Sequence, residues 1–383
     1  MKKNKIIILL FLLGMYAPSS IVQSNTFGIL NYLMFLLAFL FLILIFIQRR
    51  ITIIAFFISM SINFLLAFFT LISPFNEYSF GNIIYYLAFT LMLCLYIKDV
   101  EFTRFMFKLF TLANIINIFL GFYIIFVEFG AIGEFIYNYY SLYDSQQVFD
   151  MIIRNKPVLF FGAHNRAAFH LFLFLFLTIL TYFITKKKLY LLMSLCYVYI
   201  IYFLDSNTAL LCIAFFAIYT LRLMFKKMPR TLIMLSFPAL IFLMLKYNEI
   251  VSIISDIVNS DANGLIGRFS ESGSLMDNLN YIMDNPFRPV GLTEDSTLFF
   301  GDSGIIATLV RGSIPLLFLM YGGFLYFLRK NIKSKLIPYF LFIMFVLVGL
   351  GYDSLFFFRT LAILPFFIVL INYLMDKESA QTQ

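Results

Sequence analysis

The sequence predicts an all-α, polytopic integral membrane protein with about twelve transmembrane helices and two large external loops. Hydrophobic residues make up 62% of the 383 residues and charged residues only 13%, whereas about half of a soluble domain is apolar. The mean hydropathy is +0.94. The apolar residues fall in stretches of about 20, the length that a helix needs to cross the hydrocarbon core. Tyr must supply most of the interfacial aromatic belt, because Trp is absent.

Twelve apolar segments are predicted to span the membrane, and they form a single membrane domain over residues 1–383. The first could be mistaken for a secretory signal peptide, but it lacks a clear small-x-small cleavage site and is interpreted as an uncleaved helix. The segments are 6–22, 27–48, 51–73, 80–97, 105–127, 158–185, 189–204, 208–225, 231–246, 302–328, 336–350 and 355–374.

The connecting loops alternate in charge, and this alternation predicts the orientation. Loops on one side hold 20 of the 28 basic residues, and loops on the other hold 16 of the 20 acidic residues. By the positive-inside rule the basic side is cytoplasmic, with both termini inside. The basic balance is therefore an orientation signal, and no nucleic-acid partner is expected. The basic clusters lie at residues 2–5, 49–50, 98–108, 186–188, 222–230, 329–335 and 377.

Two connections on the predicted outer side, residues 128–157 and 247–301, are much longer than the others. Loops beyond about 15 residues are usually functional or disordered, and apolar residues throughout both loops argue against disorder. We expect small amphipathic helices that lie on the outer membrane surface and cap a cavity. The second loop shows the helical spacing with a stop signal: Leu275, Leu279, Ile282 and Met283, then Asn285 and Pro286.

Basic residues on the predicted outer side are mostly Arg, six of eight, whereas the cytoplasmic side has 14 Lys and 6 Arg. Arg offers a planar, permanently charged fork that binds phosphate through paired hydrogen bonds. The set therefore predicts an anion site, and ion pairing with outer acidic residues is the alternative for each member. The six are Arg154, Arg166, Arg268, Arg288, Arg311 and Arg359.

Two of these arginines fall in or beside predicted spans. Arg311 lies about 13 Å along its helix, and Arg359 follows three Phe residues at the start of the last span. An ionisable residue inside a span is costly and is a candidate for function. Snorkelling to the outer interface is the alternative, and it suits Arg359 better than Arg311.

The start of the central span, residues 158–185, combines a helix N-terminus with polar residues. His164 and Arg166 sit where free backbone N–H groups face outward and favour an anion. His164 is a candidate to hold a phosphate or accept a proton. His170 lies about 240° further around the helix, and a packed, hydrogen-bonded role is the more ordinary interpretation for it.

Three carboxylates on the outer side are candidates for a general base. Glu294, Asp295 and Asp302 precede the span at 302–328, and any of them could deprotonate a sugar hydroxyl. Helix capping alone would explain Asp302 and Ser303. No phosphate-binding Gly-rich loop of the Walker type occurs, so nucleotide-fuelled chemistry is not predicted.

The order of these pieces resembles the O-antigen polymerase and ligase families, which are bacterial membrane glycosyltransferases. The likeness covers about residues 150–320. Asn207 stands where an Arg is common, and the Arg-x10-Gly repeat of some polymerases is absent. The resembling stretches are KP at 156–157, FGAHNRAA at 161–168, DSNTA at 205–209, NPFRPVG at 285–291, DS at 295–296 and DSG at 302–304, with Gly312 behind.

The resemblance implies a polymerase in the bacterial inner membrane. Its substrate would be an oligosaccharide repeat unit on polyprenyl pyrophosphate, and the glycan would pass to a sugar hydroxyl on another lipid-linked unit. The arginines would stabilise the leaving pyrophosphate, and His164 or an outer carboxylate would activate the acceptor. No metal or other cofactor is expected if arginine neutralises the charge. Membrane lipid and a chain-length regulator are the other expected partners.

Two rival functions remain open. An O-antigen ligase would join the finished polymer to a lipid core, although ligases carry a His in the long fifth outer loop and this loop has none. A polysaccharide flippase or transporter would also use about twelve spans, but no matching Gly or Pro interruptions occur in the two halves of the chain.

Overall fold

The computed structural model describes most of the chain as helix. The described residues are 2–18, 29–78, 80–127, 130–141, 145–227, 275–294, 298, 303–351, 354–355 and 357–382. The predicted span at 231–246 and the site candidates Arg268, Asp295 and Asp302 lie outside them.

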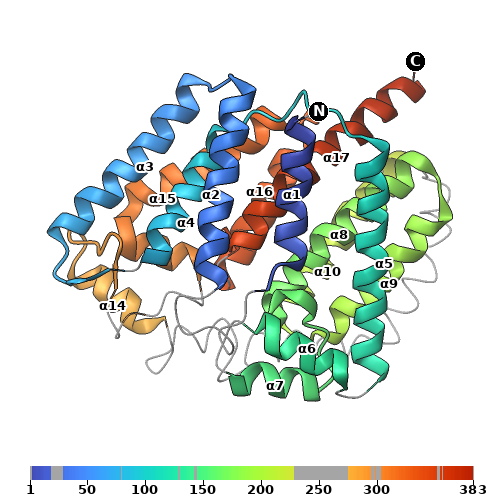
Figure 1. Ribbon diagram of the computed structural model, residues 1–383, viewed down its shortest axis with the longest axis horizontal. Coiled ribbons are helices and arrows are strands. Elements are labelled where there is room, and N and C mark those ends of the chain that lie inside the picture. The colour runs from blue at the N-terminus through green and yellow to red at the C-terminus, as the bar shows by residue number, and fades with distance from the viewer. Residues whose placement is uncertain are drawn as a thin grey trace.

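Helices from both halves of the chain pack into one bundle (Figure 1). The N-terminal helices are α1 (Lys2–Tyr16), α2 (Ile29–Gln48), α3 (Ile53–Ile72), α4 (Phe80–Cys94), α5 (Arg104–Phe126), α6 (Ala131–Tyr140) and α7 (Ser145–Ile153). The C-terminal ones are η1 (Leu159–Phe161), α8 (His164–Thr185), α9 (Lys188–Phe203), α10 (Asn207–Lys227), α14 (Met276–Asp284), α15 (Gly304–Asn331), α16 (Ile337–Gly351) and α17 (Phe358–Thr382).

Five of the described helices, α3, α5, α8, α15 and α17, are long and apolar enough to cross a membrane. The helical, membrane-embedded class is therefore supported, and the total of twelve spans stays a prediction. Apart from the segment at 231–246, each of the twelve predicted segments overlaps a helix. Several of these helices are short: a 15-residue helix such as α1 or α16 is only about 23 Å long.

Several predicted boundaries differ from the structure, and the first and tenth predicted segments show why. The first helix covers Lys2–Tyr16 and not 6–22; Pro18 disfavours helical geometry in the residue before it, so the helix ends early. The helix predicted at 302–328 is α15, which is broken at Gly312 and Ser313.

The centre of the bundle is built on α8 and α17. Their apolar windows are 94% and 89% buried, and α17 also packs along α1. A helix that is hydrophobic on all sides belongs inside a protein, not at its surface. By contrast, the apolar window of α3 is only 22% buried, which is the pattern of a helix facing lipid.

The short helices of the two long connections are the amphipathic ones that the sequence predicts. α6 and α7 lie in the first connection, and α14 lies in the second and ends at Asn285. Leu275 of the second connection is buried, and Leu279 and Ile282 pack beside it. The side chain of Met283, which belongs to the same apolar spacing, is 65% exposed.

Both chain termini lie at one end of the bundle, and α6, α7 and α14 lie at the opposite end (Figure 1). The terminal end carries exposed ion pairs, Arg50 with Asp99 at 3.0 Å and Lys333 with Asp376 at 2.5 Å. This arrangement agrees with termini on one side of a membrane. The compartment on that side stays a prediction.

A buried Asn closes the terminal end. Asn331, at the end of α15, accepts a hydrogen bond from Ile97 N at 2.7 Å and donates to Leu95 O at 3.1 Å. Its own carbonyl accepts from the Asn372 amide of α17 at 2.7 Å. One residue thus satisfies backbone groups where α4 ends and ties α4, α15 and α17 together.

We expect Asn331→Leu to cost about 3 kcal/mol of stability, because it leaves the buried backbone groups of Leu95 and Ile97 without partners. Thermal unfolding of the purified protein in mild detergent measures this as a fall in Tm of several degrees. Asn280→Leu is the matched control, since Asn280 is exposed on α14. Equal Tm values for the two variants would show that the clamp contributes little.

Candidate functional site

The break in α15 determines the geometry of the first candidate site. Ser313 adopts φ 53° and ψ −163°, outside the helical region. Pro315 has no N–H, so it cannot bond the Arg311 carbonyl four residues earlier. The freed carbonyls accept other hydrogen bonds: Val290 N donates to Val310 O at 3.0 Å, and Gly291 N donates to Arg311 O at 2.9 Å. The break therefore holds residues 290–291 against the helix.

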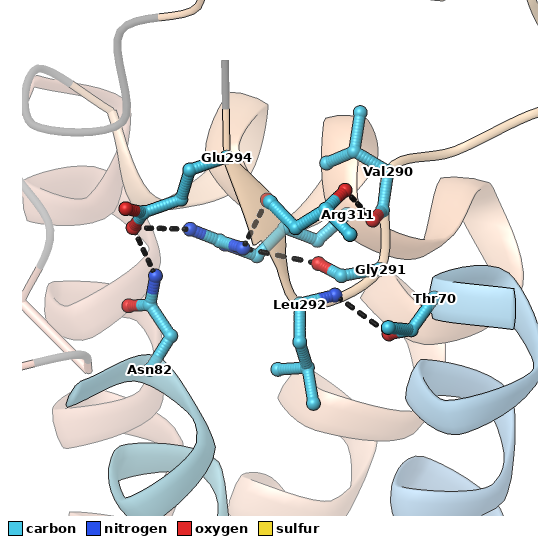
Figure 2. Close-up of polar contacts among 8 residues, drawn as sticks. Thr70, Asn82, Val290, Gly291, Leu292, Glu294 and Arg311 are labelled. Atoms are coloured by element: carbon cyan, nitrogen blue, oxygen red, sulfur yellow. Dashed lines mark hydrogen bonds and ion pairs between the residues drawn. The ribbon is translucent and has the colours of Figure 1, made fainter. Parts of the chain in front are cut away.

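The side chain of Arg311 binds the same segment from the other direction (Figure 2). Its Nη1 donates to Gly291 O at 3.0 Å and to Thr293 O at 3.4 Å, and its Nη2 lies 3.9 Å from Glu294 Oε1. The side chain is only 4% exposed, whereas that of Glu294 is 44% exposed. Arg311 is thus an internal anchor, and Glu294 is the member of the pair that reaches the surface.

Residues from α3 and α4 complete this site. Asn82 Nδ2 donates to Glu294 Oε1 at 2.6 Å, and Thr70 Oγ1 accepts from Leu292 N at 2.8 Å. Residues 77–78 and 293–294 form a two-residue antiparallel ladder, β1 (Glu77–Tyr78) with β2 (Thr293–Glu294). The carboxylate of Glu294 is therefore held by Arg311 and by the Asn82 amide. The backbone of Glu294 is fixed by its pairing with Glu77.

Close packing fixes the turn at Gly291, which adopts φ +60°. A Cβ atom at this position would collide with the backbone and the hydroxyl of Thr70. Glycine is thus required for two reasons, a left-handed backbone and the approach of α3. Gly291 belongs to the NPFRPVG stretch, whose Pro286 carbonyl accepts from Ser313 Oγ at 3.0 Å.

Arg359 forms a second cluster, at the end of α1. It is fully buried, and it donates to the carbonyls of Gly14 at 3.0 Å, Met15 at 3.3 Å and Ala17 at 2.6 Å. These are orphan carbonyls at a helix C-terminus, where a cation is favoured. Its contacts make Arg359 the cap of α1, and its full burial does not fit the snorkelling alternative.

Tyr140 of α6 completes this cap. Its hydroxyl donates to Tyr16 O at 2.7 Å, and its ring lies 5.4 Å from Arg359 Cζ. Burial raises the pKa of Tyr140 above its ordinary value, and the positive charge of Arg359 opposes that rise. The phenol accordingly remains a donor at neutral pH, which joins α6 to the bundle.

The start of α8 carries the third set of candidates. Arg166 stacks over the Phe357 ring at 4.4 Å, and His164 Nδ1 lies 3.4 Å from Met151 Sδ of α7. The N-cap residue Ala163 provides no side-chain hydrogen bond to the helix end. His170 is fully buried, with Nδ1 2.7 Å from Arg166 O and Nε2 3.1 Å from Thr360 Oγ1. The packed interpretation of His170 therefore fits.

The N-terminal part of α4 contacts both the Glu294 site and the residues just before α17. Asn82 binds Glu294, and Tyr85, three residues later on the same helix face, donates its hydroxyl hydrogen to Leu355 O. Leu355 lies two residues before Phe357, on which Arg166 stacks. These contacts come from the starts of α4 and α8 and from residues beside the start of α17. The remaining described candidates, Arg154 and Arg288, are exposed.

Sequence reasoning missed Asn82, Thr70 and Thr360. Asn82 follows Gly81 at a helix start, and an ordinary turn explains that pair of residues equally well. No signal in the sequence marks the two threonines, because Thr is common in apolar helices. Among the described residues, no group of three or more His, Cys, Asp or Glu side chains is arranged to hold a metal ion.

Comparison with known proteins gives no match. No protein-family model, curated protein or solved structure is similar to this chain.

We expect Arg359→Met to lower the stability of the fold by about 3 kcal/mol or more, because three buried carbonyls lose their donor. Arg359→Lys should restore part of it, since one ammonium cannot reach all three oxygens. The measurement is Tm in detergent, with exposed Arg288→Met as the matched control. If Arg359→Met unfolds at the same temperature as the control, the capping role is wrong.

Proposed function

We propose that this chain polymerises lipid-linked oligosaccharide repeat units at the outer face of the bacterial inner membrane. The observation that carries the proposal is the half-exposed Glu294, which Arg311 and Asn82 hold in the segment that follows α14. Helix α14 lies at the end of the bundle opposite the termini (Figure 1). A fixed carboxylate suits the activation of a sugar hydroxyl, and arginines suit the stabilisation of a diphosphate leaving group.

Glu294 supplies the base in this proposal. Its Oε1 receives the contacts of Asn82 and Arg311, so Oε2 is the oxygen offered to the acceptor. The acceptor hydroxyl gives its proton to this carboxylate as its oxygen forms a bond to C1 of the donor glycan. The bond from C1 to the pyrophosphate oxygen breaks, and its electron pair leaves with the pyrophosphate. His164 is the alternative base.

Cations at the start of α8 suit the leaving pyrophosphate. The N-terminus of α8 lacks a side-chain cap, so its free N–H groups favour an anion. Arg166 lies on the first turn of this helix, and its guanidinium stacks on the Phe357 ring, so it brings a permanent positive charge to this helix end. The exposed Arg154 and Arg288 could reach a substrate from α7 and from the NPFRPVG stretch. Arg268 belongs to the same proposed set.

A direct contact joins two of the stretches that carry the family resemblance. Lys156 Nζ lies 3.2 Å from both Asp205 O and Asp205 Oδ2, so KP at 156–157 meets DSNTA at 205–209. The NPFRPVG stretch at 285–291 is hydrogen-bonded to residues at the break of α15. Two of the resembling stretches thus meet each other, and NPFRPVG meets α15, which supports the proposal.

A flippase is the second candidate, and the break in α15 favours it. Transporters place substrates at helices interrupted within the membrane, and Gly312, Ser313 and Pro315 interrupt α15 near Arg311. The carbonyls freed at this break already bind residues 290–291, however, so they are not offered to a transported substrate. This contact is why we favour the polymerase.

The surface polysaccharide of cells with and without the gene distinguishes the functions. Loss of a polymerase leaves the lipid-anchored glycan with a single repeat unit. Polymer that accumulates unattached on its lipid carrier would instead indicate a ligase. Absence of repeat units from the outer face would indicate a flippase.

Point variants then test the residues. We expect Glu294→Gln to reduce chain extension by about 100-fold or more, since a missing base commonly costs that much, with insertion unchanged. Arg268→Ala and Arg288→Ala should each abolish extension. Arg329→Ala, at the terminal end, is the control and should extend normally. Polymers of near-normal length in both the Arg268 and the Arg288 variants would reject the assignment.

A further inference from the structure

An apolar groove lies at the end of the bundle that carries the termini, away from the candidate site. Its volume is about 700 Å³, and its lining is almost entirely aliphatic or aromatic apart from one Arg. Leu42 and Phe46 on its wall are 52% and 81% exposed, as expected for side chains that face lipid. The lining residues are Leu42, Ile43, Ile45, Phe46, Arg49 and Ile51.

Arg49 gives this groove a charged rim. It follows the last residue of α2 and adopts φ 53°, a left-handed conformation that a bulky side chain rarely takes. Its backbone N–H donates to Ile45 O at 3.2 Å, which closes the helix. Among the described residues its side chain has no acidic partner, whereas the neighbouring Arg50 is paired with Asp99.

Two further donors, from the last residue of α2 and from α15, lie near Tyr96. Gln48 Oε1 accepts from Tyr96 N at 2.9 Å, and Lys330 Nζ lies 5.8 Å from the centre of the Tyr96 ring. Gln48 is only 6% exposed. Within the described part of the chain, Gln48 Nε2 and Lys330 Nζ are buried atoms without a hydrogen-bond partner. These two donors are not among the residues that line the groove, so Arg49 is the cation that an anion in the groove would meet.

We propose that this groove binds one anionic phospholipid, with an acyl chain along α2 and the headgroup phosphate at Arg49. The charge and the shape point to the same occupant. A basic rim beside an apolar wall matches a lipid that has a phosphate above a hydrocarbon chain, and basic pockets at the cytoplasmic ends of spans bind anionic headgroups. A soluble anion would make no use of the wall, and a neutral lipid would make no use of Arg49.

The test is native mass spectrometry of the full-length protein, stripped of lipid in detergent and titrated with phosphatidylglycerol or phosphatidylcholine of the same chains. We expect phosphatidylglycerol to bind at least tenfold more tightly. Arg49→Gln should weaken that binding about fivefold, the effect of one basic residue near a charged lipid, and Arg49→Lys should retain most of it. Arg104→Gln, exposed at the same end, is the matched control.

Two further arms test the occupant. Leu42→Trp fills the groove without changing charge and should also weaken phosphatidylglycerol binding, whereas excess inorganic pyrophosphate should not displace the lipid. Equal binding of the two lipids, full binding to Arg49→Gln or to Leu42→Trp, or displacement by pyrophosphate would each overturn the proposal. These measurements do not depend on the polymerase activity.

Discussion

Backbone carbonyls that lose their helical partners inside an apolar bundle are the constraint on which this structure depends. Water cannot satisfy them there, so another donor must. At the break in α15, two backbone N–H groups of residues 290–291 take that place, and the side chain of Arg311 returns a bond to Gly291 O. The break and the segment beside it are therefore one unit, and neither geometry would persist without the other.

The same constraint operates at the end of α1. Carbonyls from Gly14 to Ala17 find donors in Arg359 and Tyr140, which come from α17 and from α6. A buried guanidinium is tolerable here because several oxygens and the dipole of α1 surround it. The first helix, the last helix and an external helix are consequently joined at one point, and this point adjoins the start of α8.

Sequence patterns identify the helices, but they do not identify which distant groups meet. Apolar stretches and the Asn285-Pro286 stop predicted most of the described elements, because these signals are local. Gly312 and Pro315 are local signals of the break in α15. The break was not predicted, because both residues lie within a continuous apolar run. The contact of Asn82 with Glu294 joins residues 212 positions apart. No spacing rule predicts such a pair, because tertiary packing creates it.

Burial divides the five predicted arginines that the structure describes into two kinds. Arg311 and Arg359 are 3% and 0% exposed and direct their N–H groups to backbone oxygens, so a substrate would have to displace bonds on which the fold relies. Arg154 and Arg288 are exposed, and Arg166 stacks on the Phe357 ring at the start of α8. Arginine is thus selected twice, for its five donors in the interior and for its permanent charge at the surface. Arg311 fixes the position of Glu294 and Arg359 caps α1, and the exposed members are the ones that suit a pyrophosphate.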